Sequence, residues 1–313
     1  ALAAALSGET MMLTDAYDRG YDADMGVFVD AGSASGFADV QRFVAGDSAM
    51  RVSRGNTNMA VSMGSLDALG SEGWARGAAI AHPYASLIED GAAINVRHET
   101  SGRLLFGVSG ASDAANGDET AQYVSAEIGA RIGRAGVSVS LGQMQESGGF
   151  LGTGTTGAFG QDMEAATDFM RLAASIPISR ETRLHVSAAQ GETRFSSSGI
   201  LARGQGITSE AIGLGVAQRN LLRDGDRLTL AAHRPVSAQG GQITMRRPMA
   251  RVASDGVTPS SGVEMATTSV DMESVRVPTE IQLGDTTRAL GCDASLGASW
   301  TPEVEDTPSL AFG

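Results

Sequence analysis

Apolar and polar side chains alternate along most of this chain. In YVSAEIGARIG, residues 123–133, Val, Ala and Ile fall on one parity, and Ser, Glu, Gly and Arg fall on the other. The same alternation recurs in GVSVSLG, RLHVSAAQ, AIGLGVAQ and DASLGASW, at residues 136–142, 183–190, 211–218 and 293–300. Because successive side chains of a strand point to opposite faces, this period of two predicts antiparallel strands with one apolar and one polar face.

The segments between these runs are of two kinds. Short polar turns are expected at residues 133–136, 179–182 and 223–226, whereas long polar loops are expected at 109–122, 145–166, 192–210 and 246–274. Short turns at one end and long loops at the other predict an up-and-down meander, which is also the pattern of membrane β-barrels. Runs of about ten residues match the length of a tilted strand that crosses a bilayer.

Alternation alone does not decide which face of the strands lies inside. In a transmembrane β-barrel the apolar face meets lipid and the polar face lines the lumen. The candidate lumen-facing residues are then Arg97, Glu127, Arg131 and His185. In the alternative, a soluble, secreted all-β structural or adhesion module, the apolar faces pack sheet on sheet. Aromatic residues make up only 5% of the chain, which favours the alternative because membrane barrels carry aromatic girdles.

Composition narrows the class of partner. The chain has 313 residues, 42% of them hydrophobic, and its 41 Gly suit a strand-rich fold with many turns. A net charge of −13 disfavours a nucleic-acid partner, because binding to phosphates needs a basic surface. Apolar runs stay shorter than the roughly 18 residues that a transmembrane helix requires, so none is predicted.

Motifs for catalysis or cofactor binding are weak. The stretch GTGTTG, residues 152–157, has the spacing of a dinucleotide fingerprint, but an amphipathic strand precedes it, and we expect a flexible loop. The 4 His residues lack metal-binding spacing, and no serine-hydrolase motif is present. We therefore expect no catalytic residue, no cofactor and no metal. An enzyme with a triad assembled across loops is the least supported alternative.

Two hairpins and one short segment carry a family resemblance. The stretch LLRDGDRLTLAAHRPVSAQGGQITMRRP, residues 221–248, combines a Gly-Asp-Arg-Leu turn with strands that end in Pro. It resembles a late hairpin in the C-terminal domain of subtilisin-like serine-peptidase autotransporters. Residues 157–195 are similar to an earlier loop and hairpin of that domain, and LTDAYDRGY, residues 13–21, to the segment after the peptidase. The matching residues are Gly157, Ala158, Thr167, Phe169, Gly191, Thr193, Gly225, Asp226, Arg227, Leu228, Pro235, Gly240 and Pro248.

The sequence departs from the family pattern at three places. His233-Arg234 precede Pro235 where the family often has Gln, and residues 283–288 lack its Pro-x-Gly-Arg-Glu. Gly313, rather than an aromatic residue, is the last residue, so either the final strand is cut short or the resemblance fails there.

The resemblance implies an all-β fold, an antiparallel up-and-down transmembrane β-barrel of about 12 strands, in the bacterial outer membrane. Residues 1–50 would be a linker or plug segment after a missing passenger, and residues 51–313 the barrel domain. The chain would be the translocator and anchor in type V secretion of a subtilisin-like serine peptidase, and would itself catalyse nothing. Its partners would be outer-membrane lipid, its own passenger and the outer-membrane assembly machinery, with no nucleic acid.

Overall fold

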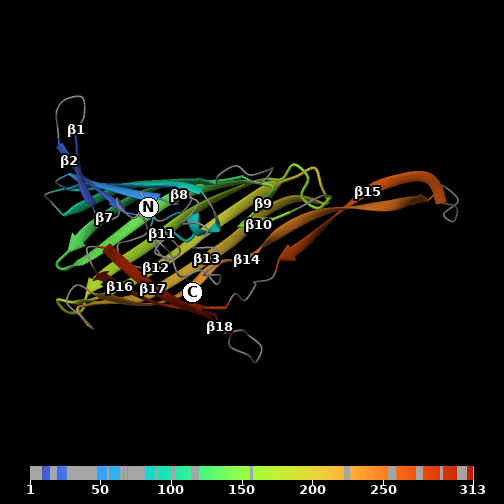
Figure 1. Ribbon diagram of the computed structural model, residues 1–313. Helices are drawn as coiled ribbons and strands as arrows, with labels where there is room; N and C mark the ends of the chain where they lie inside the picture. Colours follow the sequence, from blue (N-terminus) through green and yellow to red (C-terminus); the bar gives the residue numbers. More distant parts are fainter. Residues whose placement is uncertain are drawn as a thin grey trace.

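A computed structural model describes one large antiparallel sheet and several of its connections (Figure 1). The described residues are 9–14, 20–26, 48–54, 56–63, 66, 69, 82–88, 91–100, 103–113, 120–155, 158–221, 226–252, 259–272, 278–289, 292–301 and 309–312. No helix among these residues is both long and apolar enough to cross a membrane.

The sheet is a meander in which strands that follow one another along the chain pair side by side. It contains 16 strands, in the order β1 to β8, β11 to β14, β16, β17 and β18, while β15 pairs only with β14. The strands are β1 (Glu9–Thr14), β2 (Gly20–Gly26), β3 (Ser48–Arg54), β4 (Thr57–Met63), β5 (Gly91–Glu99), β6 (Leu104–Asp113), β7 (Thr120–Ile132), β8 (Ala135–Ser147), β11 (Glu164–Pro177), β12 (Thr182–Ser196), β13 (Leu201–Arg219), β14 (Arg227–Val252), β15 (Pro259–Met272), β16 (Glu280–Ala289), β17 (Cys292–Thr301) and β18 (Ser309–Phe312).

The predicted all-β, antiparallel, up-and-down architecture is confirmed. Strands β4 to β8 and β11 to β17 together reach about the strand number that was expected, and the short β1, β2, β3 and β18 extend the series. Among the described residues, β1 and β18 stand at opposite ends of the strand order. Residues 1–50 contribute β1, β2 and the start of β3 to the sheet, and their role as a linker or plug stays a prediction.

The predicted long loop at residues 192–210 is mostly strand. β12 continues to Ser196 and β13 begins at Leu201, so a short turn joins them. The alternation of β13 is interrupted by a register shift between Gln205 and Thr208, where Gly206 has a φ of 57°. Such a bulge adds a residue to one strand and shifts the period of two, which hid the strand from pattern analysis.

The predicted long loop at residues 246–274 is also mostly strand. β14 continues to Val252 and pairs there with β15, and the two form a hairpin that projects beyond the end of the sheet (Figure 1). Most described side chains of β15 are exposed on both faces. A strand with both faces exposed does not need apolar residues at alternate positions. The sequence of this hairpin therefore lacks the period of two that marks a half-buried strand.

The two faces of the sheet differ in burial, and the polar face is the buried one. On β7, Val124 and Ile128 are each 54% exposed, whereas Ser125 is 4% exposed; on β8, Leu141 is 60% and Ser140 is 2% exposed. We call the face with the buried side chains the inner face and the opposite one the outer face. Other large apolar side chains exposed on the outer face are Val108, Leu172, Ile212, Leu214, Leu230 and Leu283.

Two glycines make room for aromatic rings on the inner face. Phe169 of β11 has Gly142 of β8 as its cross-strand partner on one side and Gly191 of β12 on the other. A Cβ at Gly142 would overlap the Phe169 ring and the carbonyl oxygen of Val124. A Cβ at Gly191 would likewise overlap the hydroxyl end of Tyr84. Small residues here are therefore a packing requirement of the rings beside them.

Substitution of Gly142 by Ala is expected to destabilise the protein by about 1–3 kcal/mol, because the added methyl forces the Phe169 ring or the β7 backbone to move. Gly136→Ala on the same strand is the matched control, since no atom lies within 4 Å of a Cβ built there. Denaturant unfolding of both variants measures the difference. Equal stability of G142A and G136A would contradict this account of the inner-face packing.

Candidate functional site

A row of charged and hydroxyl side chains crosses the inner face through strand pairing. In successive registers, Arg97 of β5 is opposite Gly107 of β6, Gly107 is opposite Glu127 of β7, and Glu127 is opposite Ser140 of β8. Ser140 is in turn opposite Arg171 of β11. Side chains opposite one another in antiparallel strands share a face, so the register places two arginines and one glutamate in one line. We call these residues the charged row.

Arg97 and Glu127 form an ion pair within the charged row. Nη2 of Arg97 lies 3.0 Å from Oε2 of Glu127, and the side chains are 30% and 7% exposed. Gly107 lies between them, and a Cβ there would sit 3.1 Å from that same Oε2 and 3.4 Å from Cγ of Arg97. The glycine thus allows two residues on strands that are not adjacent to meet. The structure brings together two of the four residues predicted to face the lumen.

The other two predicted residues share a second row, nearer the turn that joins β7 to β8. Arg131 is opposite Gly136 of β8, Gly136 is opposite Ser175 of β11, and Ser175 is opposite His185 of β12. Arg131 lies at the exposed end of β7 and pairs with Glu99, with 2.8 Å between Nη2 and Oε1. His185 is half-buried. Both residues have inner-face parity, but neither belongs to the charged row.

A segment between β4 and β5 lies across the inner face. Residues 82–88 include the 3₁₀ helix η2 (Ala85–Leu87), and His82, Tyr84 and Ile88 are almost fully buried. Nδ1 of His82 lies 2.8 Å from the hydroxyl of Tyr123 on β7, and the hydroxyl of Tyr84 lies 2.9 Å from Oγ of Ser209 on β13. We call residues 82–88 the inner segment, because its contacts extend from β7 to β13.

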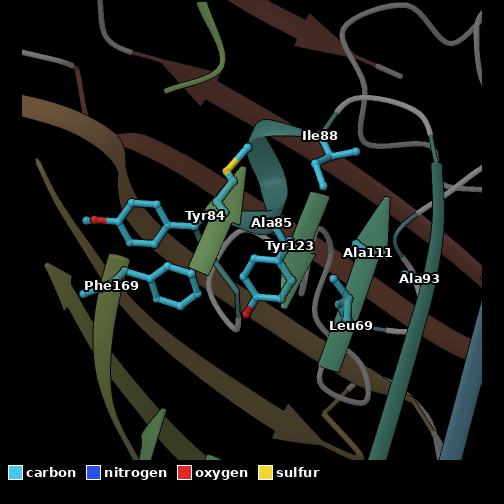
Figure 2. Packing of buried hydrophobic residues seen from close by; sticks show 11 residues of the cluster. Leu69, Tyr84, Ala85, Ile88, Ala93, Ala111, Tyr123 and Phe169 are labelled. Atoms are coloured by element: carbon cyan, nitrogen blue, oxygen red, sulfur yellow. The ribbon is translucent and has the colours of Figure 1, made fainter. Parts of the chain in front are cut away.

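Stacked aromatic rings hold the inner segment (Figure 2). The Tyr84 and Phe169 ring centroids are 4.6 Å apart with planes inclined by 15°, and those of Tyr123 and Phe169 are 5.4 Å apart, inclined by 10°. Each such pair contributes about 0.5–1.5 kcal/mol beyond the area that it buries. Aliphatic side chains of the same cluster surround them, among them Leu69, Ala85, Ile88, Ala93, Ala111, Met144, Ala189 and Ala211.

Burial shifts the pKa values of His82 and Tyr84 in the inner segment so that both side chains are neutral near pH 7. Burial lowers the pKa of His82 well below its usual value, and the charges of Arg171 and Arg97 lower it further. Burial raises the pKa of Tyr84 to about 12, partly offset by its hydrogen bond to Ser209. The Tyr123 hydroxyl donates to Oγ of Ser125 over 2.9 Å. It therefore accepts from Nδ1–H of His82, and the other ring nitrogen of the neutral imidazole, Nε2, is an acceptor.

A second cluster of side chains lies where β8 and β12 end. The hairpin of β9 (Gly149–Phe150) and β10 (Thr153–Gly154) places Phe150 against Phe195, with ring centroids 4.8 Å apart. Glu146 accepts the backbone N–H of Leu151 and of Gly152, at 2.8 and 2.7 Å. The described part of GTGTTG is thus a tight hairpin turn, where a flexible loop was expected. Its backbone N–H groups serve a carboxylate of the protein itself.

Sequence reasoning missed the inner segment and Arg171. The available signals for a buried connection were Pro83 and the apolar run after it, which lacks a period of two. Arg171 had no local signal, because its place in the charged row depends on the register of β8 against β11 across a connection of uncertain length. Within the part of the chain that the structure describes, no group of three or more His, Cys, Asp or Glu side chains is arranged to hold a metal ion.

Comparison with known proteins adds no assignment to this geometry. The sequence matches no protein-family model, and no curated protein matches it significantly.

The inner segment is expected to loosen as the pH falls below about 6.5. The pKa of His82 is lower in the folded state than in the unfolded state, so the stabilisation is complete above the unfolded value and is lost as the pH falls toward the folded one. The loss is about 1.4 kcal/mol per pH unit in that window. Hydrogen-exchange protection factors of residues 82–88, measured between pH 7.5 and about 5, test this.

The control is His82→Gln, which removes the titrating group and should give protection with little dependence on pH. An equal decline of protection in wild type and H82Q would show that some other group governs the inner segment.

Proposed function

We propose that this chain is the translocator and anchor domain of an autotransporter, a transmembrane β-barrel in the bacterial outer membrane. One observation carries the proposal: the outer face exposes many large aliphatic side chains, whereas the inner face buries Ser, Thr, Glu and Arg beside its aromatic cluster. Proteins in water bury apolar side chains and expose charged ones. A bilayer reverses the requirement on the outer face, since hydrocarbon there is the favourable neighbour of Val, Ile and Leu.

The strand lengths and the meander support the same proposal. β7 and β8 each have 13 residues and β11 has 14, which is enough to cross hydrocarbon at a tilt. In lipid every backbone N–H and C=O must be satisfied, so the proposal requires the edge strands of the sheet to pair with one another and close it. In this arrangement the outer face contacts outer-membrane lipid.

The inner face suits a water-filled passage that the inner segment narrows. The charged row would line this passage with Arg97 and Glu127, and the second row would add Arg131 and His185 toward the end nearer the β7–β8 turn. The domain makes and breaks no bond in this proposal. Its partners are lipid, the outer-membrane assembly machinery and its own passenger, for which the resemblance suggests a subtilisin-like serine peptidase.

A pair of identical substitutions on β7 tests the lipid-facing assignment. Ile128 and Ile132 are both exposed on the outer face, but Ile128 lies within the strand and Ile132 at its end. Ile128→Arg is expected to destabilise the folded protein in bilayers by about 2–4 kcal/mol, and Ile132→Arg by about 0–1 kcal/mol. Unfolding from lipid vesicles measures both values. In a soluble protein, arginine at either exposed position would be tolerated equally, and that result would overturn the proposal.

Whether the purified chain needs detergent to stay folded distinguishes the membrane barrel from a soluble module. A membrane domain is expected to need detergent and to migrate differently on gels before and after heating. A compact monomer in buffer without any amphiphile would favour the soluble, secreted structural or adhesion module instead. The low aromatic content, 5%, is the feature that keeps this rival in consideration.

A further inference from the structure

The charged row has more positive than negative charge, and its one carboxylate, Glu127, is already paired with Arg97. Arg97 and Arg171 share the row with Glu127, and Glu127 pairs with Arg97. The charges of Glu127 and Arg97 both act on Arg171, but no ion pair within 4.0 Å joins Arg171 to Glu127 among the described residues. The row therefore carries an excess positive charge at the Arg171 end.

Two guanidinium nitrogens of Arg171, Nε and Nη1, are buried and have no acceptor among the residues that the structure describes. The Arg171 side chain lies on the inner face with 7% of the residue exposed. Among the residues that the structure describes, no hydrogen-bond partner lies against its Nε or Nη1, nor against Oγ of neighbouring Ser140. A buried guanidinium that lacks an acceptor is costly, and nearly all such groups in proteins are satisfied. The row thus presents donors that suit an anionic acceptor.

Among the described residues, Glu127 is the carboxylate whose charge acts on Arg171, and it is already paired with Arg97. His82 presents its Nε2 as an acceptor that likewise has no partner in the described residues, and the neutral imidazole contributes no negative charge. On its other flank Arg171 is opposite Ala189 of β12, and Ala189 is opposite Ala211 of β13, so the row continues with methyl groups. These small side chains leave the guanidinium without a competing acid on that side.

We infer that Arg171, with Ser140 beside it and Arg97 at the far side of Glu127, forms a binding site for a small oxyanion on the inner face of the sheet. Guanidinium groups bind carboxylates and phosphates through parallel N–H···O bonds, and the Ser140 hydroxyl adds a further donor. A hydrogen phosphate matches this set best. Its oxygens accept from Arg171 and Ser140.

Ligand-dependent stability is the measurement that tests this site. The full chain is unfolded by heat in the medium that keeps it folded, in increasing inorganic phosphate at constant ionic strength maintained with chloride. A ligand that binds only the folded state raises its stability by a saturable amount. Saturable stabilisation is expected with phosphate, weaker stabilisation with acetate, and none when chloride alone is varied. Because the readout is anion binding, it is separate from any requirement for lipid or detergent.

Substitutions assign the effect to the charged row. Arg171→Gln should weaken phosphate binding at least about tenfold, since a hydrogen bond to a charged group contributes that much. Arg131→Gln is the matched control, an arginine of the same face outside the row, and should leave the affinity unchanged. Glu127→Gln should tighten binding, because it removes the carboxylate of the charged row.

The inference is overturned if phosphate does not stabilise the wild-type protein, or if it stabilises wild type and R171Q equally. If R171Q does not fold, E127Q decides the matter: tighter binding of phosphate supports the site, and an unchanged affinity refutes it.

Discussion

The separation of the two faces of the sheet is the constraint on which the rest of this structure depends. Antiparallel pairing leaves each strand no freedom in where its side chains point, so residues of one parity must all share one environment. Here the parity that carries Ser, Thr, Arg and Glu is enclosed, and the parity that carries Val, Ile and Leu is outward. A shift of one residue in any pairing would exchange these environments along a whole strand.

Enclosing a polar face creates a packing problem that small residues and one inserted segment solve. Small residues such as Ser125 of β7 and Ala189 of β12 occupy part of the inner face, and Gly107, Gly142 and Gly191 open space for larger neighbours. Into that space come the Arg97–Glu127 pair and the rings of Tyr84 and Phe169. The inner segment supplies apolar contact where the strands themselves offer little, so the interior is held by a few aromatic stacks and hydrogen bonds.

The same arrangement concentrates charge where it is hard to satisfy. A polar interior is tolerated when every donor and acceptor finds a partner, and a partly satisfied network is costly. Arg97 and Glu127 form an ion pair within the charged row, whereas Nε and Nη1 of Arg171 are buried and have no hydrogen-bond partner among the described residues. The anion site inferred on the inner face rests on this imbalance and does not depend on how the sheet closes.

Period-two alternation by itself determined the strand-rich class, the antiparallel meander and the parity of Arg97, Glu127, Arg131 and His185. These follow from local stereochemistry, in which each residue's direction is set by its neighbours along the chain. Only the tertiary structure decided which face is exposed and where Arg171 lies. It also decided that Arg97 meets Glu127 over Gly107 and that residues 82–88 dock on the inner face. They depend on register between strands and on contacts such as that of Tyr84 with Ser209, 125 residues apart. No local pattern encodes such contacts, because the free energy that selects them arises only when the strands are already side by side.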